Sequence, residues 1–186
     1  TLPRHGITTT FVDPSNPNNF QNAAQENTRV FFIESLGNPK LDVLDIESIS
    51  VKAKSQKVPL VVDNTVATPY LSNPIAYGAN IVIQSLTKYI NGNGTALGGA
   101  IIDAGTFDWG SGKFPEFTEP SAGYHGLIYN EVIRAASFIA KVRIEGLRDY
   151  GAALSPFNAF QIIQGLETLE VRILKHSQNA LELAQW

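Results

Sequence analysis

Four short apolar runs, separated by turn residues, mark the first hundred residues of the chain. They lie at 29–34, 59–63, 81–85 and 99–103 and are rich in β-branched side chains. Each run is continuous rather than alternating, which indicates strands buried on both faces, as in a parallel sheet covered by helices. Residues 41–56 space their apolar side chains close to the helical period. This pattern predicts an α/β fold, a mostly parallel sheet with helices on both faces.

The second half of the chain loses the strand pattern. Residues 104–126 have no period and are rich in glycine and aromatic residues, which predicts a long irregular excursion of a kind that is usually functional. Residues 131–150 read as one long helix or two broken ones. A Ser-Pro pair at 155–156 is a good helix start, and Gly165 ends or kinks that helix. The final amphipathic stretch predicts a last helix over 168–186.

Composition excludes several classes of site and partner. The formal net charge of −3 gives no strong electrostatic reason to bind nucleic acid or an anionic membrane. No apolar run reaches the ~18 residues that a membrane helix needs. Cysteine is absent, which excludes disulfides, zinc–thiolate sites and iron–sulfur clusters, and the three histidines lack ligand spacing, so we expect no metal site. Because methionine is also absent, we expect an internal part of a longer protein.

Polar side chains gather where the predicted strands end. Asn38 follows the first strand, and Asp63 closes the second. Ser85 closes the third, and Thr87 and Lys88 lie in the turn after it. Ligands of open α/β sheets bind beyond the carboxyl ends of the strands, so one cleft could collect an amide, a carboxylate, two hydroxyls and an amine. Taken singly, each has an ordinary alternative: turn or helix capping for the first four, and a solvated surface position for the lysine.

The glycine-rich segment 92–99 invites a dinucleotide interpretation. A GxGxxG pattern beginning at Gly92 would need its third glycine where Leu97 stands, and the segment does not follow a strand end. No phosphate-binding GxxxxGK[ST] loop and no GxSxG elbow occurs in the sequence. A turn that returns the chain to the fourth strand is therefore favoured over nucleotide binding.

Three motifs carry a resemblance to a known family. The sequence has Glu-Ser-Leu-Gly-Asn-Pro at 34–39, Asp-Asn-Thr at 63–65 followed by Thr-Pro-Tyr-Leu at 68–71, and Gln-Ser-Leu-Thr-Lys-Tyr-Ile at 84–90. In order and spacing these resemble the Cys/Met-metabolism family of pyridoxal-phosphate enzymes, and the resemblance runs along essentially the whole chain. It implies the large cofactor domain of fold-type I (aspartate-aminotransferase-like) enzymes, with pyridoxal 5′-phosphate as cofactor.

The resemblance implies a role for each residue at the strand ends. Lys88 corresponds to the lysine that carries the cofactor as a Schiff base, and Asp63 to the carboxylate paired with the pyridinium nitrogen. Ser85 and Thr87 correspond to the hydroxyls on the phosphate. Asn38 corresponds to the amide near the cofactor's 3-oxygen and the substrate carboxylate. The chemistry agrees, because a carboxylate keeps the ring nitrogen protonated and a lysine amine can act as a base at Cα.

Two features resemble one subgroup of the family, the O-acetylhomoserine sulfhydrylases: Leu-Gly before Asn-Pro, and the excursion at 107–126. The implied reaction is γ-replacement, in which O-acetyl-L-homoserine and sulfide (or a thiol) give L-homocysteine and acetate in methionine biosynthesis. Cystathionine γ-synthase and methionine γ-lyase activities are alternatives within the family, and an inactive α/β packing or binding domain is the non-enzymatic alternative. The resemblance also implies a cytoplasmic homotetramer.

The resemblance divides the chain into two parts. Residues 1–150 would be the C-terminal part of the cofactor domain, and residues 151–186 would be helices leading into a further C-terminal domain. The family's phosphate-binding glycine turn and ring-stacking tyrosine would precede this segment, and the arginine for the substrate carboxylate would follow it. We therefore expect this part alone to be inactive.

Overall fold

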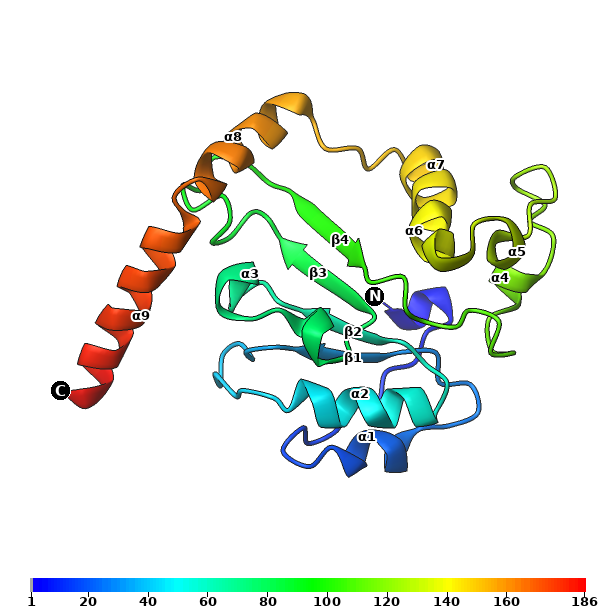
Figure 1. The fold of residues 1–186 in the computed structure, drawn as a ribbon, viewed down its shortest axis with the longest axis horizontal. Coiled ribbons are helices and arrows are strands. Elements are labelled where there is room, and N and C mark those ends of the chain that lie inside the picture. Colours follow the sequence, from blue (N-terminus) through cyan, green and yellow to red (C-terminus); the bar gives the residue numbers. More distant parts are fainter. Residues whose placement is uncertain (1) are drawn as a thin grey trace.

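Four strands form one sheet in the computed structural model, which describes residues 2–186 (Figure 1). The order is β1-β2-β3-β4; the first three strands run parallel, and β4 is antiparallel to β3. The strands are β1 (Phe31–Glu34), β2 (Leu60–Asp63), β3 (Ile81–Ser85) and β4 (Gly99–Asp103). The predicted mostly parallel sheet is confirmed, with an antiparallel last strand because the turn after β3 returns the chain directly beside it.

Helical segments occupy most of the remaining chain. Before the last strand they are η1 (Leu2–His5), α1 (Asn18–Ala23), α2 (Ile46–Ser55), α3 (Thr68–Leu71) and η2 (Pro74–Tyr77). After it they are α4 (Pro115–Thr118), α5 (Tyr129–Val132), η3 (Arg134–Ala136), α6 (Ser137–Lys141), η4 (Val142–Leu147), α7 (Arg148–Tyr150), α8 (Pro156–Leu166) and α9 (Leu169–Gln185). Within residues 2–186 no helix combines the length and the apolar character that crossing a membrane requires.

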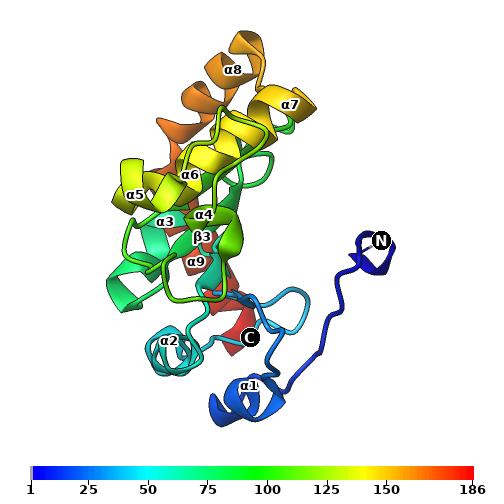
Figure 2. The same cartoon turned by 90° about the vertical axis from the view of Figure 1, so that its right-hand side faces the viewer.

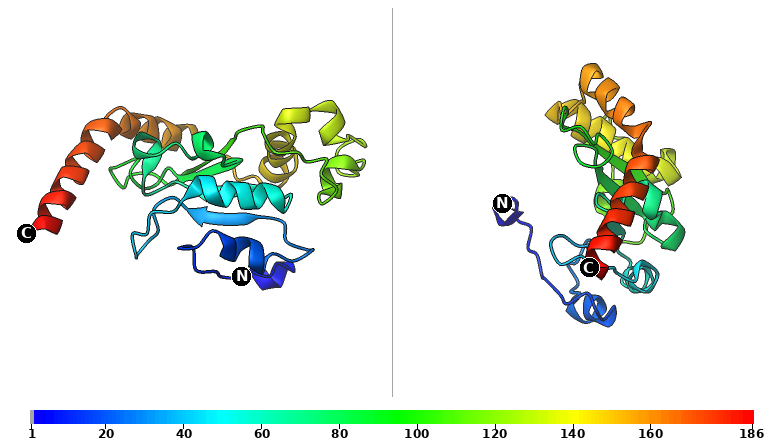
Figure 3. Two further views of the ribbon diagram at one scale, coloured as in Figure 1. Left: turned by 60° about the horizontal axis from the view of Figure 1, so that its bottom comes forward. Right: turned by 90° about the vertical axis from the view of Figure 1, so that its left-hand side faces the viewer.

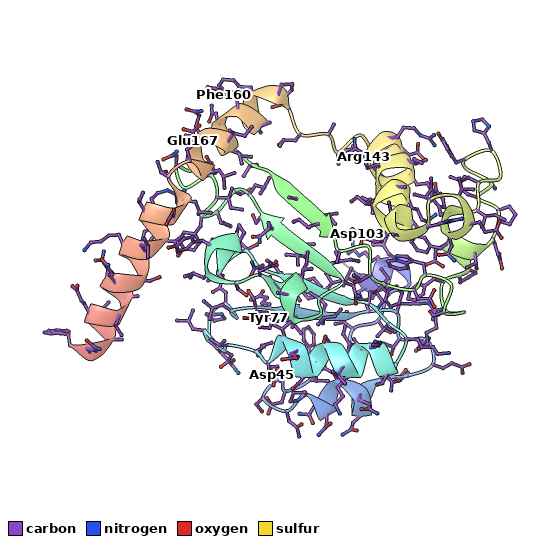
Figure 4. The ribbon with its side chains drawn as sticks, in the orientation of Figure 1. Asp45, Tyr77, Asp103, Arg143, Phe160 and Glu167 are labelled. Atoms are coloured by element: carbon purple, nitrogen blue, oxygen red, sulfur yellow. The ribbon has the colours of Figure 1, made fainter. Side chains whose placement is uncertain are left out.

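The first face of the sheet packs against α1 and α2. Alternate strand residues and the buried side of α2 form one apolar cluster, whose members include Phe31, Ile33, Leu60, Val62, Val82, Ile49 and Ala53. The predicted helix at 41–56 begins later, at Ile46, because the Asp45 carboxylate caps it by accepting from Ser48 N–H at 3.0 Å (Figure 4). In Figure 2, the layer of α1 and α2 lies apart from the segments on the other side of the sheet.

The second face of the sheet is covered unevenly. The excursion after β4 and helices α4–α6 bury an aromatic cluster, in which Trp109 stacks on Phe117 with ring centroids 4.3 Å apart. Ile81, near the beginning of β3, packs into this cluster. On the same face, Phe32 and Ile101 remain 53% and 45% exposed. The described residues therefore cover only part of this face.

The segment predicted as one helix or two is broken into short pieces from α5 to α7, including the π-helical turn η4. Glu145 on η4 ties the pieces together: Oε1 accepts from Ser121 Oγ at 2.9 Å and from Tyr129 OH at 3.0 Å, and Oε2 pairs with Lys141 Nζ. Burial raises the pKa of Glu145, but the hydrogen bonds from these three residues outweigh it and leave the pKa below its ordinary value.

Helix α8 lies against the turn after β3, and α9 extends from it away from the sheet, at the end of the molecule opposite α4–α7 (Figures 1 and 3). The predicted start of α8 is confirmed, since Ser155 Oγ accepts from Asn158 N–H at 3.1 Å and Pro156 is the first helical residue. Gly165 is the penultimate residue of α8, so the helix ends within one residue of the predicted position. Ile162, Leu169 and Ile173 pack with residues of the turn after β3 in a third apolar cluster.

We expect Ile49→Ala to destabilise the whole protein by about 2–5 kcal/mol, because it leaves a cavity in the first cluster. Val51→Ala on the same helix is the matched control, since Val51 is 59% exposed and Ile49 is fully buried. Urea unfolding measures both. Equal losses from the two variants would contradict the assigned buried face of α2.

The Glu145 network predicts a pH dependence of stability. A carboxylate whose pKa is lowered by folding stabilises above its unfolded pKa, and that stability is lost as the pH falls through the folded value. We expect Glu145→Gln to be less stable than wild type at pH 7, with the gap narrowing as the pH falls below 4.5, the ordinary pKa of a glutamate. Urea unfolding at a series of pH values measures the gap, and a gap that does not change with pH would contradict the assignment.

Candidate active site at the strand ends

The ends of β2 and β3 present two polar side chains on the same face of the sheet. Asp63 lies opposite Ile83 in the parallel register, and the alternation along β2 places it on the face of Val61, which packs against the second cluster. Ser85 follows Ile83 by two residues and shares that face. Both side chains are half-buried. The structure thus brings the predicted carboxylate and hydroxyl to one edge of one face.

Thr65 joins these two strand ends. Its backbone N–H donates to Asp63 Oδ1 at 2.9 Å, and its Oγ1 accepts from Ser85 N–H at 2.8 Å. The first bond closes a local turn that orients the carboxylate. The second gives the Ser85 N–H, at the end of β3, an acceptor. The sequence analysis missed this role, because the bond to residue 85 links positions that are distant in sequence.

Asn64 anchors the loop behind the site and is almost completely buried. Its Oδ1 accepts from Ser35 Oγ at 2.7 Å, and its Nδ2 donates to the carbonyls of Thr68 and Ser72, each at 3.0 Å. Thr68 has a φ of +62°, which is unusual for a β-branched residue. This network holds α3 against the end of β2 and leaves Asp63 with a fixed backbone.

Lys88 lies in the turn that follows β3. Its N–H donates to Ser85 O at 3.2 Å, and its carbonyl accepts from Gly92 N–H at 2.8 Å. The side chain is exposed, and its amine enters no ion pair with the residues that the structure describes. The backbone of the turn is therefore fixed by two hydrogen bonds, and the amine is available to a ligand.

Thr87 has a different environment from Ser85. Its Oγ1 donates to Gly98 O at 3.2 Å and accepts from Gly98 N–H at 3.1 Å, which pins the two sides of the turn between β3 and β4. The hydroxyl proton is thus engaged, and it must rotate away from Gly98 O to reach a phosphate. This segment is the turn between two strands that the sequence analysis favoured over a nucleotide loop.

Asn38 lies in the loop after β1. Its N–H donates to Glu34 Oε2 at 2.8 Å, and its side chain is exposed. Glu34 stands opposite Asp63 in the register of β1 with β2. The Asn38 loop is therefore tied to the strand next to Asp63, at the same edge of the sheet.

The residues present fit the cofactor that the sequence motifs imply. A carboxylate held by a backbone N–H suits a protonated ring nitrogen, a serine hydroxyl at a strand end suits a phosphate, and an amine outside any ion pair suits an aldehyde. These three groups belong to Asp63 at the end of β2, Ser85 at the end of β3 and Lys88 in the turn after β3. The carboxylate therefore provides a partner for the ring nitrogen, and the amine provides one for the aldehyde.

A cleft of about 440 Å³ lies elsewhere, between residues 115–123 and 141–150. These residues belong to the excursion and to helices α4–α7, which lie at the end of the sheet away from the turn after β3 (Figure 1). Within the described residues, the excursion therefore packs the aromatic cluster and does not reach the strand ends.

Comparison with known proteins agrees with the motifs. The model of the Cys/Met metabolism PLP-dependent enzyme family matches residues 1–186. O-acetyl-L-homoserine sulfhydrylase of Leptospira meyeri is 53% identical over 100% of this chain and 44% of its own length. Homocysteine/cysteine synthase of Saccharomyces cerevisiae is 46% identical over 98% of this chain and 42% of its own length. The chain thus spans less than half the length of these relatives.

Solved structures give the same result. A putative O-acetylhomoserine (thiol)-lyase of Campylobacter jejuni, crystallised with a pyridoxyl-lysine phosphate, matches 99% of this chain and 46% of its own, with a TM-score of 0.91 and 40% identity. O-acetylhomoserine sulfhydrylase of Wolinella succinogenes matches 100% of this chain and 49% of its own, with a TM-score of 0.79 and 35% identity. The predicted fold-type I class is confirmed by these matches.

The Thr65 bridge predicts a difference between two substitutions. Thr65→Val keeps the shape but removes the acceptor for Ser85 N–H, so we expect a loss of about 1 kcal/mol or more in unfolding free energy. Thr65→Ser keeps the hydroxyl oxygen and is the matched control. Urea unfolding of the whole protein measures both, and a valine variant at least as stable as the serine variant would contradict the bridge.

Proposed function

The chain belongs to the family of Cys/Met metabolism PLP-dependent enzymes, and on that premise we propose that the whole protein is an O-acetylhomoserine sulfhydrylase. It would convert O-acetyl-L-homoserine and sulfide, or a thiol, into L-homocysteine and acetate. The names of the relatives in Leptospira meyeri and Saccharomyces cerevisiae support this choice within the family. Because the chain spans less than half of those relatives, the activity is proposed for the whole protein.

One structural observation carries the proposal: Asp63 and Ser85 end adjacent strands on one face, joined through Thr65, and the Lys88 amine follows in the next turn. We assign Lys88 as the residue that attaches pyridoxal 5′-phosphate. Asp63 would hold the proton on the ring nitrogen, and Ser85 and Thr87 would donate to the phosphate.

Asn38 completes the set, with its amide toward the 3-oxygen and the substrate carboxylate. The tie between its backbone and Glu34 keeps this amide at the edge where Asp63 lies. An amide N–H suits such oxygens, because it donates a directional hydrogen bond and carries no charge.

The reaction needs carbanions at Cα and then Cβ of the amino acid, and bound pyridoxal phosphate supplies the electron sink that stabilises them. With cofactor and substrate bound, the Lys88 amine would take the proton from Cα and would serve as the base for Cβ. The Asp63 carboxylate would accept a hydrogen bond from the protonated ring nitrogen and so favour that protonation state. Acetate then departs from Cγ, and sulfide replaces it.

The remaining assignments are proposals of the same kind. Residues 1–150 would belong to the cofactor domain, and residues 151–186 would lead into a further domain. The protein would act on small amino-acid substrates in the cytoplasm as a homotetramer. These assignments rest on the family resemblance, and size measurements on the whole protein test the tetramer.

The attachment of the cofactor is tested by borohydride reduction of the whole protein and mapping of the labelled lysine. We expect the label on Lys88, and we expect Lys88→Ala to lose the label together with ~10²-fold or more of the activity. Lys54→Ala is the control, because Lys54 is an exposed residue of α2 on the other layer. A label that persists in Lys88→Ala would overturn the site.

The substrate is tested by supplying O-acetyl-L-homoserine with sulfide and measuring homocysteine. We expect this turnover to exceed cystathionine formation from a homoserine ester with cysteine, and ketoacid release from methionine. Faster cystathionine formation or faster ketoacid release would instead identify cystathionine γ-synthase or methionine γ-lyase. A protein that carries no cofactor and none of the three activities would support the non-enzymatic alternative.

A further inference from the structure

The turn that carries Lys88 is held from outside by helix α9. Within the turn, Asn91 N–H donates to Leu86 O at 3.0 Å and Gly92 N–H donates to Lys88 O at 2.8 Å. The next two carbonyls along the chain, those of Tyr89 and Ile90, point to the guanidinium of Arg172 on α9. The last part of the turn is therefore fixed by a residue that is distant in sequence.

The planar guanidinium of Arg172 donates four hydrogen bonds. Nη1 donates to Tyr89 O at 2.7 Å, and Nη2 donates to Ile90 O at 3.4 Å and to Gly165 O at 2.8 Å. Nε donates to Thr168 Oγ1 at 3.1 Å. A guanidinium suits this task because its donors lie in one plane and its charge strengthens each bond. It joins the turn, the end of α8 and the start of α9.

Close packing leaves little freedom around this contact. A Cβ added to Gly165 would lie 2.0 Å from Asn91 O, so α8 rests directly on the backbone of the turn. Gly92 has a φ of +71°, and a Cβ there would lie 2.5 Å from Arg172 Cζ. Gly165 thus allows α8 to approach the backbone of the turn, and Gly92 leaves room for the Arg172 guanidinium.

The side chains of the turn strengthen the contact. Ile90 is buried with Leu169 and Ile173 in the third apolar cluster. The ring of Tyr89 meets His176, one helical turn beyond Arg172, edge to face at 5.6 Å between centroids. Polar, apolar and aromatic contacts therefore all fasten residues 89–90 to one side of α9.

We propose that Arg172 is a positioning residue for Lys88: it fixes the two carbonyls that follow the lysine and so couples the position of the amine to helix α9. The proposal rests on the proposed function of Lys88 as the residue that attaches the cofactor. Arg172 itself bonds to backbone carbonyls and to Thr168, so it acts through the turn.

Hydrogen exchange of the whole protein without cofactor tests the mechanical part. We expect amides of residues 86–92 in Arg172→Ala to exchange about tenfold faster or more, because charge-assisted hydrogen bonds are lost, while β3 stays protected. Arg172→Lys keeps the charge without the planar fork and should lie between this variant and wild type. Lys175→Ala, exposed on the same helix, is the matched control and should exchange like wild type.

The visible absorbance of the protein loaded with pyridoxal phosphate tests the effect on the lysine. We expect the pH midpoint of the band to shift in Arg172→Ala and the rate of cofactor release to rise about tenfold, with partial recovery in Arg172→Lys. A merely structural role would change stability and leave the midpoint where it is. The Lys175→Ala control should retain both the midpoint and the release rate.

Wild-type exchange of residues 86–92 in Arg172→Ala would overturn the proposal. If the alanine variant does not fold, wild-type exchange in Arg172→Lys would overturn it equally. Faster exchange with an unchanged midpoint and release rate would reduce Arg172 to a structural residue and also overturn it. Borohydride labelling of another lysine in wild type would instead refute the proposed function of Lys88. The contact between Arg172 and the turn would then have no role in the reaction.

Discussion

The hydrogen bond from Ser85 N–H to Thr65 Oγ1 is the constraint on which the arrangement of the site depends. Parallel pairing sets Asp63 opposite Ile83, but there β2 ends while β3 continues to Ser85. Thr65 keeps them together, because its own N–H orients the Asp63 carboxylate while its hydroxyl holds the end of β3. A single threonine thereby connects the acid of one strand to the turn that carries the amine of the next.

The two ends of the sheet serve different purposes. At one end, the excursion and helices α4–α6 bury aromatic rings around Trp109, and nothing there converges on the strand ends. At the other end, side-chain hydrogen bonds from Asn64, Thr65 and Thr87 brace the segments that follow β2 and β3. This division agrees with the general rule that open α/β sheets bind ligands beyond the carboxyl ends of their strands.

The sequence predicted the positions of the strands better than the direction of β4 or the contacts between distant residues. The strands at 81–85 and 99–103 were located correctly, since their apolar runs have clear ends. A run of apolar residues carries no direction, so the antiparallel course of β4 had no signal beyond the glycine-rich turn. Asp63, Ser85 and Lys88 could be proposed together because each lies at the end of a predicted strand or in the turn after it.

Thr65 and Arg172 had no comparable signal, because their partners are backbone groups, which look the same at every residue. The contact of His176 with Tyr89 had no signal either, since His176 is exposed on α9 and only its ring edge meets Tyr89.

Phe32 and Ile101 lie half-exposed on the same face of the sheet as Asp63, so water still reaches the apolar part of that face. If another layer of protein covers them, the local dielectric around Asp63 falls, and a charge–charge attraction there strengthens severalfold. The strength of the acid's hold on a cationic ring is therefore set by whatever shields these two side chains as much as by the acid itself.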